Sequence, residues 1–124
     1  MLFRSDLNLL QGKWVLVSSK FGINPERQVE GAFVVVRESV MEFHNREGAV
    51  TRNRIFLEQT KKHRKITLHG LGGTDPDEKP LAGLYRLAGD EFILCFGWES
   101  GSVASTHEGG VGMQRYVFKR APKP

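Results

Sequence analysis

Residues 81–96 read LAGLYRLAGDEFILCF, which is the clearest strand–turn–strand pattern in the chain. It predicts two strands, Leu81–Leu87 and Glu91–Phe96, joined by a tight turn at Gly89-Asp90. Because a two-residue turn can join only antiparallel strands, this segment is expected to form a β-hairpin.

The segments on both sides of this hairpin continue the pattern of short strands and turns. Further strands are expected over Lys13–Ser19, Val29–Arg37, 41–44, Ala49–Glu58, Lys65–His69 and Met113–Lys119. Loops are expected over Phe21–Gln28, Gly70–Pro80 and the glycine-rich Gly97–Gly112, with tight turns near Glu38-Ser39 and Glu47-Gly48. About eight strands without a crossover helix predict an all-β, antiparallel up-and-down β-barrel, with a β-sandwich as the alternative.

A short helix is expected before the first strand. Ser5 is a suitable N-cap, Asp6 suits the first turn, and Leu7 and Leu10 can share one face before Gly12 ends the helix. A helix this short is not stable alone, so it must pack against the barrel.

Length and composition indicate one domain, residues 1–124, that can bury a core without a disulfide or a metal. The single cysteine, Cys95, lies in an apolar run and is expected to be buried and inert. No signal peptide or membrane-spanning run is visible, so a cytoplasmic protein is expected, unless a longer precursor is exported. The net charge is +4, and basic residues gather between residues 52 and 65.

Two motifs resemble a known superfamily. A short helix followed by Gly12-Lys13-Trp14 resembles the G-x-W opening of lipocalins and other calycins. The LQGKW opening, the 81–96 hairpin and the terminal FKR resemble a family of small bacterial lipocalin-like domains of unknown function. The resemblance implies that Trp14 sits at the closed end of the barrel under an arginine from the last strand, Arg120, with Arg115 as the alternative. It implies no catalytic residue.

Strand alternation predicts which side chains point into the barrel. The expected inward set is large and mostly apolar: Trp14, Leu16, Val35, Met41, Phe43, Ile66, Leu68, Tyr85, Phe92, Leu94 and Phe96. Such a barrel is either fully packed or holds a small apolar cavity. For a cavity, the candidate ligand-binding residues are Tyr85, Arg52, Arg54, His44, Met41 and Phe43, with His69 as a further polar candidate. A Tyr–Arg pair would suit a carboxylate.

The sequence lacks a recognisable catalytic or metal-binding signature. The four histidines show no metal-ligand spacing, and no nucleophile elbow surrounds a serine, so neither an enzyme nor a cofactor is expected. The expected function is the binding of a small hydrophobic or amphipathic ligand inside the barrel. The alternative is a filled barrel that binds a partner through its basic hairpin and long loops, and nucleic acid is not expected because aromatic residues are scarce there.

Overall fold

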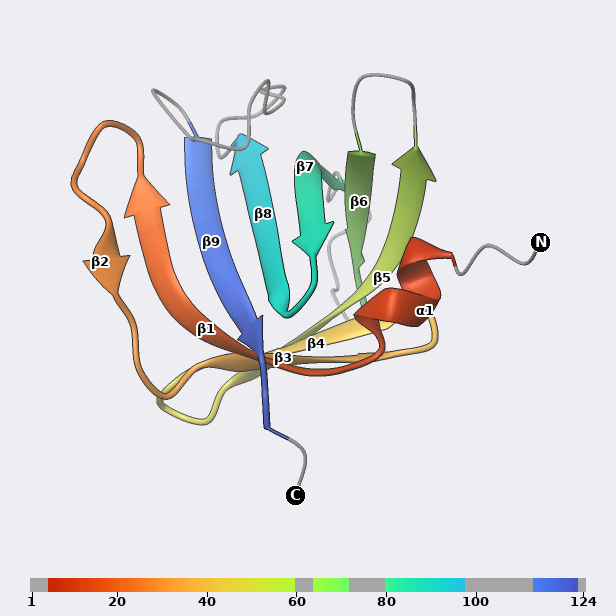
Figure 1. Cartoon of the computed structure of the whole chain (residues 1–124), viewed down its shortest axis with the longest axis horizontal. Coiled ribbons are helices and arrows are strands. Elements are labelled where there is room, and N and C mark those ends of the chain that lie inside the picture. The colour runs from red at the N-terminus through yellow and green to blue at the C-terminus, as the bar shows by residue number, and fades with distance from the viewer. Residues whose placement is uncertain (1–4, 60–63, 72–79, 98–112, 123–124) are drawn as a thin grey trace.

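A computed structural model describes residues 5–59, 64–71, 80–97 and 113–122. The described chain forms one short helix and an antiparallel sheet whose first and last strands pair with each other (Figure 1). The elements are α1 (Asp6–Leu10), β1 (Gly12–Phe21), β2 (Arg27–Gln28), β3 (Phe33–Arg37), β4 (Val40–His44), β5 (Val50–Gln59), β6 (Arg64–Gly70), β7 (Leu81–Ala88), β8 (Glu91–Gly97) and β9 (Met113–Arg120).

The sheet closes into a barrel of eight strands, as the sequence predicts. Consecutive strands from β3 to β9 are neighbours, and β1 joins β3 on one side and β9 on the other. The two-residue strand β2 lies in the predicted loop 21–28 and pairs with Ser18 and Ser19 of β1. Among the described strands, closure leaves no long unpaired sheet edge.

The barrel has two distinct ends. At the closed end lie α1, the turn at Glu38-Ser39 and the turn at Gly89-Asp90. At the opposite, open end lie the last residue of β1, the last residue of β8 and the first residue of β9.

Trp14 and Arg120 form the base of the closed end. Trp14 is fully buried, and the Arg120 guanidinium carbon lies 4.1 Å from the centre of the indole ring. The indole Nε1 donates a hydrogen bond to the Leu10 carbonyl (2.9 Å), and Arg120 donates to the carbonyls of Leu9 (2.6 Å) and Gln11 (3.0 Å). The arginine therefore satisfies the Leu9 carbonyl in the last turn of α1 and the carbonyl of the C-cap residue Gln11.

The junction between α1 and β1 depends on glycine. Gly12 has a φ of +112°, and a Cβ there would lie 3.5 Å from an Arg120 nitrogen. Residues other than glycine rarely adopt this backbone conformation. Next to it, the Gln11 side chain accepts from the Glu38 amide (2.7 Å) and donates to the Glu38 carbonyl (2.8 Å). These two bonds tie the helix to the turn between β3 and β4.

The helix forms as predicted. The Ser5 side chain accepts a hydrogen bond from the Asn8 amide (3.2 Å), which is the N-cap interaction. Leu10 is fully buried and Leu7 packs against the core, so both leucines face the barrel.

One inward assignment is wrong. Val34 and Val36 are each 1% exposed and belong to the core, whereas Val35 lies on the outer face opposite Lys13 and Glu42. Three consecutive valines carry no alternation signal of their own, so only the pairing with neighbouring strands sets their orientation.

Candidate functional site

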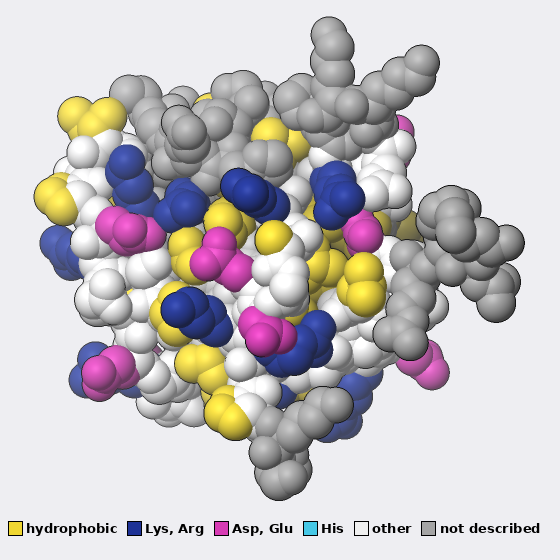
Figure 2. Space-filling view, viewed as in Figure 1, with side chains coloured by type: hydrophobic (Ala, Val, Ile, Leu, Met, Phe, Trp, Pro, Cys, Tyr) yellow, Lys and Arg dark blue, Asp and Glu magenta, His cyan; other side chains and the backbone are white. Residues whose placement is uncertain are grey.

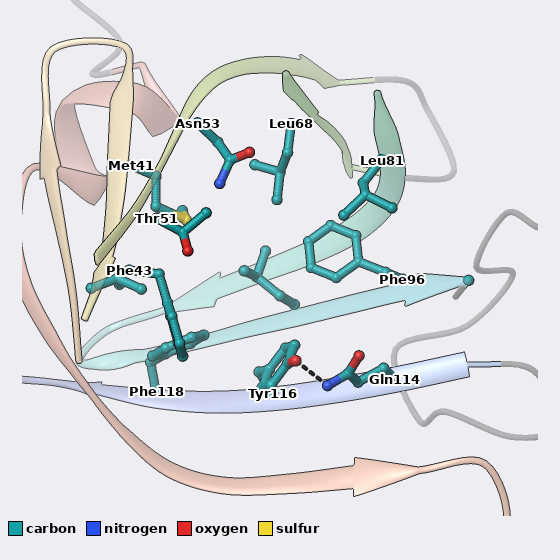
Figure 3. A pocket seen from close by; sticks show the side chains of 13 residues that line it. Met41, Phe43, Thr51, Asn53, Leu68, Leu81, Phe96, Gln114, Tyr116 and Phe118 are labelled. Atoms are coloured by element: carbon teal, nitrogen blue, oxygen red, sulfur yellow. Dashed lines mark hydrogen bonds between the residues drawn. The ribbon is translucent and has the colours of Figure 1, made fainter. Parts of the chain in front are cut away.

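A cavity of about 300 Å³ occupies the open half of the barrel (Figure 3). Its described lining is mainly apolar and comes from every strand of the barrel except β1. The lining residues are Val34, Met41, Phe43, Thr51, Asn53, Leu68, Leu81, Leu94, Phe96, Gly97, Gln114, Tyr116 and Phe118. Towards the closed end, Trp14 and Phe92 are fully buried, and the centres of their rings lie 5.6 Å apart.

The cavity has an apolar floor on the side of the closed end, and its walls are more polar near the open end. Phe118 is buried at the floor, and along β9 it is followed towards the open end by Tyr116 and Gln114. On β5 the buried Ile55 is followed in the same direction by Asn53 and Thr51. Figure 3 shows the polar side chains of β5 on one wall and those of β9 on the facing wall.

The two polar residues that β9 contributes to the cavity wall form a hydrogen bond with each other. The Gln114 side-chain amide donates to the Tyr116 hydroxyl (Figure 3). Burial raises the pKa of Tyr116, and the bond from Gln114 opposes this rise only in part. The Tyr116 phenol is therefore neutral at physiological pH and can both donate and accept a hydrogen bond.

Met41 and Phe43 lie where the sequence predicts, on the cavity wall. The prediction that His44 and Arg52 line the interior is wrong, because both contact Glu42 on the outer face. The Glu42 carboxylate accepts from His44 Nε2 (2.8 Å) and from Arg52 Nε (2.9 Å). These bonds, from His44 first and then Arg52, lower the pKa of Glu42.

Arg54 is also on the outer face, and it is exposed. It lies opposite Val40 on one side and His69 on the other, while the intervening residues Asn53 and Ile55 point inward. His69 is exposed as well and packs against the exposed ring of Phe56, so it does not reach the cavity.

Tyr85 is an interior residue, but it lies at the closed end. It is 1% exposed, and its hydroxyl donates to Asp6 Oδ2 over 2.6 Å. The same oxygen lies 3.4 Å from the Gln59 amide nitrogen and 3.6 Å from Arg64 Nε. A second cavity of about 480 Å³ borders this cluster beside α1. The expected Tyr–Arg pair for a ligand carboxylate therefore does not form in the open-end cavity.

Replacing Tyr85 should change how stability depends on pH. Desolvation first, and then the bond to Asp6, raises the pKa of Tyr85 above its ordinary value near 10. The unfolded chain thus loses the phenol proton at a lower pH than the folded protein, so stability should fall as pH rises above about 10. We expect Tyr85→Phe to unfold about 1–3 kcal/mol more easily at neutral pH, through loss of the bond to Asp6.

Urea unfolding of both proteins from pH 7 to 11 measures this effect. The difference between them should shrink above pH 10, because the variant lacks the titrating group. If the difference in unfolding free energy between the two proteins stayed constant with pH, the raised pKa of Tyr85 would be contradicted.

The polar groups of the cavity were missed by sequence reasoning, although a signal for them exists. Residues two positions apart in a strand point to the same face. Thr51 and Asn53 therefore share a face with the inward Ile55, and Gln114 and Tyr116 share a face with Phe118. Arg52 and Arg54 are charged, but they lie on the same face of β5 as the exposed Phe56.

Other candidate sites find little support in the described chain. Within residues 5–59, 64–71, 80–97 and 113–122, no three His, Cys, Asp or Glu side chains are grouped to hold a metal. None of the helices found there is long and apolar enough to cross a membrane. His63, His107, Lys61 and Lys62 lie outside the described residues. On the face shown in Figure 2, basic side chains are interspersed with acidic ones.

Cys95 is fully buried, as predicted, but outside the barrel interior. It packs with Leu84, and Met113 is partly buried against the pair.

Comparisons with known proteins leave the function open. No protein-family model matches the chain, and no curated protein matches it. Among solved structures, the chain resembles an uncharacterised protein from Bacteroides eggerthii, with 14% identity and a TM-score of 0.49. The match covers 90% of this chain and 99% of that one. This likeness carries no argument about function.

Proposed function

We propose that this protein binds a small hydrophobic or amphipathic molecule in the open-end cavity of its barrel. The observation that carries the proposal is a cavity with a mostly apolar lining at the end of the barrel opposite the buried Trp14. Ligand sites in proteins are commonly concave and apolar with a few convergent polar groups. A lipocalin-like origin would agree with this, since the helix, Gly12-x-Trp14 and Arg120 form the base that such proteins share.

The size of the cavity limits the size of the ligand. Since a water molecule occupies about 30 Å³ of liquid, 300 Å³ corresponds to about ten such volumes. The expected ligand therefore has on the order of ten non-hydrogen atoms, which is at the small end of protein ligand sites.

Filling the cavity should abolish binding. Leu94 is 3% exposed and lines the cavity, so the larger indole of Leu94→Trp has space only in the cavity itself. We expect wild-type protein to bind toluene, a small apolar probe, in a calorimetric titration, and Leu94→Trp to bind it at least about tenfold more weakly.

Ala88→Trp is the matched control, because Ala88 is exposed at the end of β7 next to the Gly89-Asp90 turn. This variant adds an indole far from the open-end cavity and should bind toluene as wild type does. Absence of toluene binding by wild type, or an equal loss in both variants, would refute the proposal.

A further inference from the structure

We infer that the open-end cavity selects an uncharged ligand whose polar end both donates and accepts hydrogen bonds, such as a primary amide or an alcohol. This inference rests on the proposed function and adds the chemical class of the ligand. It follows from the nature, the position and the free bonding capacity of four side chains: Thr51, Asn53, Gln114 and Tyr116.

The described lining of the cavity is uncharged at neutral pH. None of the described residues that line the cavity carries an ionisable acid or base, apart from the Tyr116 phenol. The nearby cations Arg52 and Arg54 are on the outer face, and Arg52 is bonded to Glu42 there. Among the described lining residues, a carboxylate or an ammonium group would find no counter-charge to offset the loss of its water, which is unfavourable.

The polar side chains of the cavity wall can form further hydrogen bonds. Within the described chain, the side chains of Thr51 and Asn53 make no hydrogen bond, although Asn53 is half-buried in the cavity wall. A primary amide such as that of Asn53 offers two donor hydrogens and an acceptor oxygen. Across the cavity, Tyr116 accepts from Gln114 and keeps its own hydroxyl hydrogen available.

The polar residues come from opposite sides of the barrel. β5 and β9 are separated by three strands on one side and three on the other, so they are opposite each other in the ring of eight. Their polar side chains therefore lie on facing walls of the cavity, nearer the open end than Phe118 (Figure 3). A ligand would enter with its apolar part first and leave its polar end between Asn53 and Tyr116.

Three probes with the same carbon chain test this inference: octanamide, octanoate and octylamine. Each has about the number of non-hydrogen atoms that the cavity can hold. In calorimetric titrations of the wild-type protein near neutral pH, octanamide should bind about tenfold or more tightly than either charged probe. Equal or tighter binding of octanoate or octylamine would overturn the inference.

Variants of Asn53 provide a second readout that a general loss of folding cannot imitate. Asn53→Asp keeps the side-chain shape and adds a negative charge, so it should shift the preference towards octylamine and away from octanamide. Asn53→Leu should weaken octanamide binding by a larger factor than toluene binding, because toluene has no polar end that could lose a hydrogen bond. If both variants kept the wild-type preference among the probes, Asn53 would not contact the polar end of the ligand.

The two proposals can fail separately. If wild-type protein binds toluene but does not distinguish the three eight-carbon probes, the cavity is a binding site and the inferred selectivity is wrong. If none of the four probes binds, the proposed function itself is wrong.

Discussion

Replacing Trp14 by alanine is expected to lower the free energy of unfolding by about 3–5 kcal/mol, the usual cost of removing a large buried aromatic side chain. Trp14 has no exposed surface, and its ring contacts both Phe92 and the Arg120 guanidinium. The variant also loses the bond from the indole to the Leu10 carbonyl, which helps to hold α1 on the barrel. Since small domains are stable by only about 5–15 kcal/mol, this change should bring the protein close to unfolding.

Urea denaturation followed by circular dichroism measures this loss. Ile23→Ala is the control, because Ile23 is 79% exposed and its truncation should change stability by less than about 0.5 kcal/mol. A loss below about 1 kcal/mol for Trp14→Ala would contradict the role of Trp14 as the base of the barrel.

Replacing Gly83 by alanine should also destabilise the protein, but for the opposite reason, since it adds an atom where there is no space. A Cβ at Gly83 would lie 2.4 Å from the Cys95 carbonyl oxygen and 2.6 Å from a ring carbon of Phe96. The oxygen belongs to the backbone of β8, so β7 and β8 would have to move apart. Overpacking of this kind costs about 1–3 kcal/mol and sometimes more, and we expect the upper part of that range.

The reverse change at the preceding residue provides the control. Ala82 is half-buried on the outer face, and Ala82→Gly should cost no more than about 1 kcal/mol, the usual effect of glycine in a strand. Thermal unfolding of both variants compares them directly. Equal stability of wild type and Gly83→Ala would show that the two strands are not held as closely as described.

The sequence was sufficient to predict the architecture because the decisive signals are local. The 81–96 hairpin carries its own turn at Gly89-Asp90, and the pairing of Leu87 with Phe92 and of Ala88 with Glu91 follows from it. The N-cap at Ser5 and the stop at Gly12 likewise depend on neighbouring residues. Where local alternation was clear, as at Met41 and Phe43, the orientation was also correct.

The site was predicted less well because it depends on the relation between distant strands. Alternation places Tyr85 inside the barrel, but only the stagger of the strands decides that it meets Asp6 at the closed end. Arg52 and Arg54 were assigned by their chemistry, against the parity of Ile55 on the same strand. Asn53 and Tyr116 come from opposite strands, and no sequence pattern brings them together.

A methyl-detected NMR titration of the protein with octanamide shows directly which part of the barrel the ligand occupies. Binding in the open-end cavity predicts intermolecular contacts and chemical-shift changes at the methyl groups of Met41, Leu68 and Leu94, which line it. The methyl groups of Leu7 and Leu57, beside the second cavity at the closed end, should change little. Contacts confined to Leu7 and Leu57, or no saturable change at any methyl group, would contradict the account.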